Sequence, residues 1–112
     1  MMRKINVAFA NESLKEAFRE LEKGDFQDKH LFSFLNRAID DLFKNPSCGT
    51  KIAKRLWPKE YIKQGITNLW KYNLPDSWRL VYTIKQDEIY IVSVLLEWFD
   101  HKGYERRFHY LI

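Results

Sequence analysis

Arg79 is the leading candidate in this sequence for a side chain that binds phosphate. It lies in LPDSWRLVYTIK (residues 74–85), where apolar and polar residues alternate with the period of two that is typical of a β-strand. A guanidinium beside an apolar face either belongs to an ordinary solvated face or binds phosphate, because its planar fork holds two oxygens and stays charged. An ion pair with Glu97 or Asp100 is the structural alternative.

Two further candidates, His101 and Lys102, directly follow the last predicted strand. His101 is a candidate general acid or base because an unperturbed imidazole titrates near neutral pH. Lys102 is a candidate second cation for phosphate. The alternatives are an exposed or locally capping histidine and a solvated lysine beside Asp100. Glu97 interrupts an apolar strand and is a base, a partner of Arg79 or part of a structural salt bridge.

The positive charge of the chain is concentrated in its second half. Residues 1–50 hold eight Lys/Arg and eight Asp/Glu, whereas residues 51–112 hold eleven and seven, which accounts for the net charge of +4. All four Trp and all six Tyr lie in this basic half. Basic surfaces with interleaved aromatic rings bind nucleic acid, although acidic proteins are attracted equally well.

Several classes of protein find no support in the sequence. Cys48 is the single cysteine, so neither an internal disulfide nor a paired-cysteine metal site is expected. P-loop, zinc and Ser-His-Asp patterns are missing, and we expect no metal and no cofactor. No apolar run approaches the length of a membrane span, and the N-terminus is unlike a signal peptide, so the cytoplasm is the expected compartment.

The order of predicted elements indicates one α+β domain covering residues 1–112. A strand over residues 5–9 precedes a helix with a Ser13–Glu16 capping box and Gly24 as its terminator. Residues 28–46 give a second helix, capped by Asp28, and Pro58 opens a one-turn helix.

Beyond Gly65 the pattern predicts three strands, over residues 66–74, 78–85 and 88–99, of which the last is expected to be central. A break at Gly103 precedes a short terminal helix. The fold is therefore β-α-α-β-β-β, with a helical hairpin packed on a small, mainly antiparallel sheet.

This order, with RLVY at residues 79–82 and HKGY at residues 101–104, resembles the RelE/ParE superfamily of toxins from type II toxin–antitoxin systems. The resemblance extends over nearly the whole chain in topology and is carried by about twenty residues. RelE-like members cleave messenger RNA, usually on the ribosome and without a metal. ParE-like members lack the catalytic set and act on DNA gyrase. The antitoxin partner of RelE-like members wraps the toxin and often neutralises the basic face of its sheet.

The resemblance implies roles for individual residues. Arg79 matches the family arginine, and Tyr104 matches a tyrosine that stacks a base or transfers a proton, the alternative being an aromatic that packs the terminal segment onto the sheet. The ending RRFHY also resembles the terminus of a branch in which a histidine and tyrosine take part in cleavage, so His101 and His109 compete for one role. The further candidates for RNA or antitoxin binding are Lys51, Lys54, Arg55, Lys59, Arg106 and Arg107.

We therefore expect a cytoplasmic, metal-independent endoribonuclease that acts on mRNA, bound by a cognate antitoxin. Arg79 and Lys102 would hold phosphate, and His101 and Tyr104 would transfer protons or stack. The rival is a binding module of the same fold, either a ParE-like enzyme inhibitor or a decayed toxin that binds antitoxin or RNA. A housekeeping RNA-binding domain is the third hypothesis.

Overall fold

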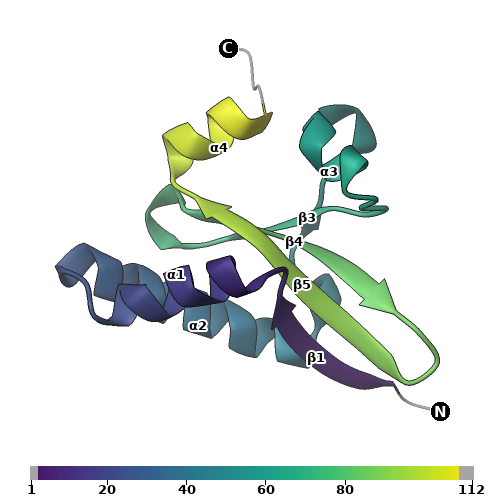
Figure 1. Cartoon of the computed structure of the whole chain (residues 1–112), viewed down its shortest axis with the longest axis horizontal. Helices are drawn as coiled ribbons and strands as arrows, with labels where there is room; N and C mark the ends of the chain where they lie inside the picture. Colours follow the sequence, from purple (N-terminus) through teal and green to yellow (C-terminus); the bar gives the residue numbers. More distant parts are fainter. Residues whose placement is uncertain (1–2, 109–112) are drawn as a thin grey trace.

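The computed structural model describes residues 3–108, and they form the expected α+β architecture (Figure 1). The elements, in chain order, are β1 (Lys4–Phe9), α1 (Glu12–Glu22), α2 (Phe26–Lys44), β2 (Thr50–Lys51), α3 (Lys59–Lys63), β3 (Trp70–Asn73), β4 (Arg79–Gln86), β5 (Tyr90–Phe99) and α4 (His101–Phe108). No helix among these residues is both long enough and apolar enough to cross a membrane.

The sheet has five strands in the order β1-β5-β4-β3-β2. β1 runs parallel to β5, and the other neighbours are antiparallel. The two-residue strand β2 was not expected from the sequence, because so short a segment carries no alternation. The predicted strand 66–74 is shorter in the structure, since only Trp70–Asn73 pairs as β3. β5 is internal as expected, but β4 occupies the middle of the sheet.

Helices α1 and α2 cover one side of the sheet, which we call the first face (Figure 1). α2 contributes the stripe predicted from its helical period, and these residues are at most 5% exposed: Leu31, Leu35, Ala38 and Leu42. From the sheet, Leu80, Tyr82 and Leu95 join the same core cluster. This is the larger of the two apolar cores.

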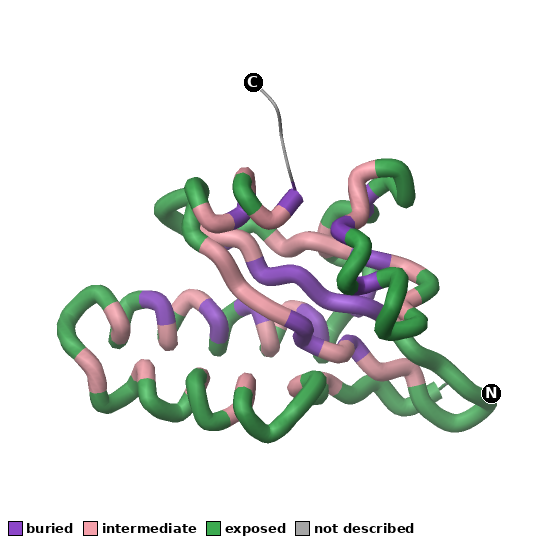
Figure 2. Tube along the Cα trace, turned by 45° about the horizontal axis from the view of Figure 1, so that its top comes forward, coloured by how far each residue is buried: buried purple, intermediate pink, exposed green. Residues whose placement is uncertain are grey.

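The opposite side, the second face, is covered by α3, the segments around it and α4 (Figure 1). Its core cluster joins Val81 of β4 and Leu96 of β5 to Tyr61, Tyr104 and Phe108 of the covering helices. The buried stretch of β4 therefore lies between two apolar layers (Figure 2). Both faces being buried explains why the strand is a continuous apolar run after Arg79.

The helix starts differ from those predicted. α1 is capped by Asn11, whose side chain accepts a hydrogen bond from the Leu14 amide at 2.8 Å, so the predicted Ser13–Glu16 capping box is wrong. α2 begins after Asp25, and Asp28 is the third residue of a reciprocal capping box with Asp25. In both cases a competing polar residue lay two or three positions earlier.

The C-terminal helix also differs, because the predicted break at Gly103 is wrong. α4 runs without interruption from His101 to Phe108. Asp100 explains this start, since its carboxylate accepts a hydrogen bond from the Gly103 amide at 2.7 Å. A Cβ atom on Gly103 would lie 2.9 Å from that carboxylate, so the glycine fits the cap instead of ending the helix.

A tight corner ties α2 to the middle of the sheet. The Tyr82 hydroxyl donates a hydrogen bond to the Pro46 carbonyl at 2.7 Å and accepts one from the Gly49 amide at 3.1 Å. A Cβ on Gly49 would come within 2.6 Å of this hydroxyl and of the Lys71 carbonyl. The corner thus requires glycine.

The β3–β4 connection is a strained turn. Asp76 and Ser77 have φ angles of 59° and 63°, and the Trp78 amide donates to the Pro75 carbonyl at 3.3 Å. Two successive positive φ angles define a type I′ turn, which favours glycine at the second central position.

Ser77→Gly should therefore stabilise the protein. Removing Cβ relieves about 1–2 kcal/mol of left-handed strain, and the greater freedom of glycine in the unfolded chain costs about 0.5–1 kcal/mol. We expect the free energy of unfolding in urea to rise by about 0.5 kcal/mol. Ser33→Gly, on the exposed side of α2, is the control and should lower it. A loss of stability in Ser77→Gly would contradict the strain.

Alkaline pH should also destabilise the protein through Tyr82. Burial raises the pKa of Tyr82 from 10.0 to about 12. The unfolded chain then loses this proton first, so the stabilisation is complete below pH 10 and is lost as the pH rises towards 12. Urea unfolding across this range should show a shallower decline for Tyr82→Phe than for the wild type. Identical slopes would exclude Tyr82 as a source of the effect.

Candidate functional site

Two cations and one aromatic ring meet on the second face. The Nζ atom of Lys71 lies 5.5 Å from the centre of the Tyr104 ring, and the Cζ atom of Arg79 lies 5.9 Å from it. β3, β4 and α4 each supply one member. Lys71 pairs with Val81 in the ladder, so it shares the second face with Arg79, two residues before Val81. We call Lys71, Arg79 and Tyr104 the basic–aromatic cluster.

Neither cation of this cluster forms an ion pair with a carboxylate of residues 3–108. Glu97 and Asp100, the partners considered for Arg79, are bound to other groups. The hydrogen bond described for the Arg79 guanidinium goes to the Trp78 carbonyl at 3.2 Å. Both side chains are only partly exposed. Two half-buried cations near one ring repel one another, and an anion placed between them would relieve this repulsion.

The ring of Tyr104 is a fixed part of the cluster. Tyr104 is 3% exposed and stacks on Phe108 with 4.4 Å between ring centres. Phe99 packs edge-on at 6.3 Å. Tyr104 therefore packs α4 onto the sheet, as the structural alternative for this residue had it, and it also presents its ring to the two cations.

His101 and Lys102 occupy different sides of α4. His101 lies one helical turn before Tyr104 and is its neighbour on the helix surface. Its Nε2 atom pairs with Glu105 at 2.8 Å, and 62% of the side chain is exposed. Lys102 is exposed and lies two residues before Tyr104, so it points roughly 200° away around the helix axis. The expected convergence of Arg79 with Lys102 is not present, and Lys71 stands at the cluster instead.

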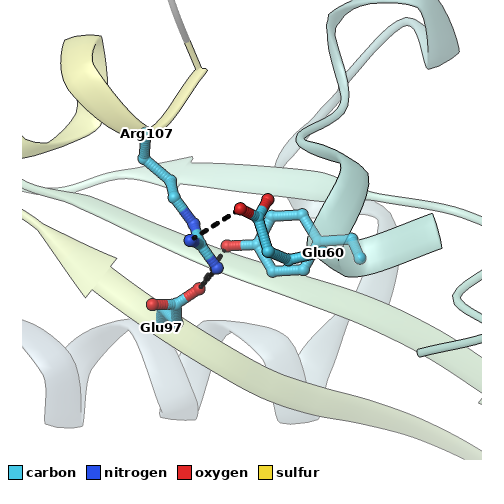
Figure 3. A network of polar contacts seen from close by, with 4 residues as sticks. Glu60, Glu97 and Arg107 are labelled. Atoms are coloured by element: carbon cyan, nitrogen blue, oxygen red, sulfur yellow. Dashed lines mark hydrogen bonds and ion pairs between the residues drawn. The ribbon is translucent and has the colours of Figure 1, made fainter. Parts of the chain in front are cut away.

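A second polar group lies beside the cluster and joins α3, β5 and α4 (Figure 3). Glu97 Oε1 accepts a hydrogen bond from the Tyr61 hydroxyl at 2.6 Å and another from Arg107 Nη2 at 2.8 Å. Arg107 Nη1 lies 3.9 Å from Glu60, and the guanidinium lies 5.1 Å from the centre of the Tyr61 ring. We call these four residues the Arg107 network.

The Arg107 network fixes protonation states as well as positions. Burial, followed by the hydrogen bond to Glu97, raises the pKa of Tyr61 well above its ordinary value. The phenol therefore remains a proton donor to Glu97 at neutral pH. Glu97 is thus part of a salt bridge, with Arg107 and not Arg79 as its partner.

A β-bulge orients Glu97 toward this network. Val81 pairs with Glu97, but the next residue, Tyr82, pairs with Leu95, so Leu96 is the extra residue of β5. Leu96 lies in the core of the second face, and Glu97 contacts Tyr61 and Arg107 on that same side. A bulge turns two successive side chains the same way, which a regular strand cannot do.

The remaining basic candidates divide into two groups. Five of them are exposed and form no ion pair within residues 3–108: Lys51, Lys54, Arg55, Lys59 and Arg106. The ammonium of Lys54 lies 6.0 Å from the centre of the Trp57 ring. Arg107 is different, because only 27% of its side chain is exposed and it binds Glu97. His109 and Tyr110, which compete for the roles of His101 and Tyr104, lie outside the described residues.

An apolar cavity of about 410 Å³ lies on the other side of the molecule, between α2 and the β3–β4 turn. Its lining includes Phe26, which is 73% exposed, and Trp78. The carboxylates of Asp28 and Asp76 also line it, so this surface is acidic where the second face is basic. No group of three or more metal-ligating side chains occurs within residues 3–108.

Sequence reasoning missed Lys71, Tyr61 and the division between Arg106 and Arg107. Lys71 could not be placed from the alternation in residues 70–73 alone, because the face that it shares with Arg79 follows from its pairing with Val81. Tyr61 carried no signal of periodicity, because it belongs to an irregular segment. Arg106 and Arg107 differ in exposure because they lie on different sides of α4. This could not be predicted without knowing that the helix starts at His101.

Comparison with family models gives one match that covers most of the chain. Residues 9–96 match the model described as ParE toxin of type II toxin–antitoxin system, parDE. The matched range includes β3, β4 and most of β5 and stops before α4. Comparison with curated proteins and with solved structures finds no match.

Replacing Arg107 should destabilise the fold, whereas replacing its neighbour should not. Arg107→Met leaves Glu97 without its cationic partner, and hydrogen bonds to charged groups contribute about 1.5–3 kcal/mol. Because both side chains are partly exposed, we expect a loss of about 1–2 kcal/mol in urea unfolding. Arg106→Met is the matched control and should change stability by less than about 0.5 kcal/mol. Equal effects of the two substitutions would contradict the assignment.

Proposed function

This chain belongs to the ParE toxin family of type II toxin–antitoxin systems, and we propose that it is an endoribonuclease whose scissile phosphate binds at the basic–aromatic cluster. As a toxin of this type it has an antitoxin protein as its partner. Endonuclease activity is the finer part of the proposal. It is supported by one observation above the others: Lys71 and Arg79 converge on Tyr104 with no carboxylate among the described residues to neutralise them.

The chemistry matches what metal-free RNA cleavage demands. The ribose 2′-hydroxyl gives its proton to a base and attacks the adjacent phosphorus, and negative charge grows on the non-bridging oxygens. The bond from phosphorus to the 5′-oxygen of the next nucleotide then breaks, and an acid protonates that oxygen. The fork of Arg79 binds two of these oxygens, and the ammonium of Lys71 adds a point charge, the role expected from the sequence for Lys102. The ring of Tyr104, which is buried, holds the two cations in place through cation–π contacts.

Proton transfer falls to groups on α4. His101 lies one turn from Tyr104, and Glu105 holds its Nε2 atom, which leaves Nδ1 directed elsewhere. A carboxylate that orients an imidazole is a recurrent arrangement for general acid–base catalysis. His101 keeps its proposed role in proton transfer, with Glu105 as its orienting partner, whereas the burial of Tyr104 keeps its hydroxyl away from a bound RNA.

The antitoxin has two surfaces of opposite character to cover. An acidic segment would neutralise the exposed cations of the second face and block the cluster. The apolar cavity beside Phe26, with its carboxylates, suits apolar and basic side chains of the same partner. Covering both would bury the most exposed aromatic residue and the unpaired cations together.

The second candidate function is inhibition of DNA gyrase by contact, because the matching family is described by the ParE toxin. ParE-like members lack the catalytic set. In that case the basic–aromatic cluster would bind a protein or DNA surface, and no RNA would be cut.

The experiment incubates the toxin with ribosomes and a short message in the presence of EDTA. We expect fragments that end in 2′,3′-cyclic phosphate, since the 2′-oxygen is the nucleophile. Arg79→Ala and Lys71→Ala should each lower the rate by about 100-fold, as expected for the loss of a group that stabilises charge in the transition state.

Lys85→Ala is the matched control, because Lys85 is an exposed cation on the same strand as Arg79, and it should retain activity. Circular dichroism establishes that each variant is folded. Intact RNA together with inhibition of gyrase supercoiling would replace the endonuclease proposal with the second candidate.

A further inference from the structure

A cleft of about 370 Å³ lies between the first half of α1 and the Arg107 network. One wall has an apolar part, Ala10, Leu14 and Ala17, beside the polar side chains of Asn11 and Ser13. The other carries Glu97 and Arg107, which form hydrogen bonds and ion pairs within the network (Figure 3). Apolar surface of the kind that Ala10, Leu14 and Ala17 provide, facing a few convergent polar groups, is usual in a pocket that binds a small molecule or a base.

The topology of the sheet creates this cleft. The pairing of β1 with β5 ends at Phe9 and Leu95, whereas β5 continues to Phe99. The last part of β5 therefore has no strand beside it on the side of β1. The bulge at Leu96 then turns Glu97 toward the second face, at the floor of this gap.

Glu97 and Arg107 retain hydrogen-bonding capacity after they have bound each other. Both bonds to Glu97 end on Oε1, and Oε2 accepts none from residues 3–108. Arg107 Nη1 has only the 3.9 Å contact with Glu60, which is too long for a hydrogen bond. The Glu97 and Arg107 side chains are 36% and 27% exposed, so a ligand in the cleft can reach them.

We propose that this cleft binds a guanine base of an RNA chain. The Watson–Crick edge of guanine presents two adjacent N–H donors beside a carbonyl oxygen. The remaining oxygen of Glu97, Oε2, accepts from both donors, and Arg107 Nη1 donates to the oxygen of guanine, while the apolar part of the α1 wall packs against the ring.

Other ligands match the two charges less well. A phosphate would be repelled by Glu97, and an ammonium group by Arg107. Adenine has no carbonyl oxygen for Arg107, and uracil has a single N–H donor for Glu97. Cytosine offers an amine and a carbonyl oxygen, but the ring nitrogen between them is an acceptor and not an N–H donor.

The position of the cleft suits an RNA that is also held at the basic–aromatic cluster. Arg107 and Tyr104 are neighbours one turn apart on α4, and Val81, the ladder partner of Glu97, is two residues from Arg79 on β4. A base in the cleft and a phosphate at the cluster can therefore belong to nearby nucleotides. This inference rests on the proposed function, since it assumes that the toxin binds RNA.

The test measures the binding of short uridine-rich 2′-O-methyl RNAs that differ in one central base. The blocked 2′-oxygen prevents cleavage, so fluorescence anisotropy gives dissociation constants with the full chain. We expect the RNA with guanine to bind about tenfold more tightly than those with adenine, cytosine or uracil. Glu97→Gln should reduce this preference to less than about twofold, because a carboxamide whose oxygen binds Tyr61 and Arg107 turns its NH2 group, a donor, toward the two donors of guanine.

Glu16→Gln is the matched control, since Glu16 pairs with Arg19 at the same 2.8 Å on the exposed side of α1, and the guanine preference should persist. Equal affinity of the wild type for all four RNAs would overturn the guanine site. A guanine preference that is unchanged in Glu97→Gln would overturn it as well. The cleavage assay with Arg79→Ala judges the proposed function separately. Guanosine monophosphate that binds as tightly as the RNA, with no effect of Arg79→Ala, would also overturn the inference, because the ligand would then be a free nucleotide.

Discussion

The structure depends on the burial of both faces of β4. Leu80 and Tyr82 are fully buried on one side, and Val81 and Thr83 are buried on the other, so two separate layers must cover one strand. The first layer is a helical hairpin with a long apolar stripe. The second layer has only short helices, and stacked aromatic rings and the polar contacts of Arg107 attach these helices to the sheet. The basic–aromatic cluster, where we propose that phosphate binds, lies where this smaller layer ends and Arg79 becomes partly exposed.

The second layer explains why function and stability are difficult to separate here. Tyr104 packs α4 against the sheet and at the same time presents its ring to Lys71 and Arg79. Glu97 links the layer to β5 through a bulge and also borders a cleft. Residues of this kind contribute to the core with one surface and to ligand contacts with another, so a loss of activity on substitution is informative only beside a measurement of folding.

The sequence predicted the elements whose patterns are local and long. The α2 stripe, the β4 alternation and the α+β class follow from periodicity, and the predicted fold is confirmed. The two-residue strand β2 was missed because its pairing depends on a strand that is distant in the chain. The Asn11 cap was missed because several adjacent polar residues could cap the helix. At the site, Arg79 and Tyr104 could be predicted to meet, whereas Lys71 and the rotation of Lys102 required the ladder register and the true start of α4.

The parallel pairing of β1 with β5 has a consequence for how the chain acquires its structure. Lys4 lies beside Tyr90, so β1 can pair with β5 only after the whole segment between them has left the ribosomal exit tunnel. Contacts of such long sequence separation slow folding. Until β1 pairs with β5, the edge of β5 is open to any other extended peptide nearby. During this interval of folding, β5 can therefore pair with a strand of another protein before it pairs with β1.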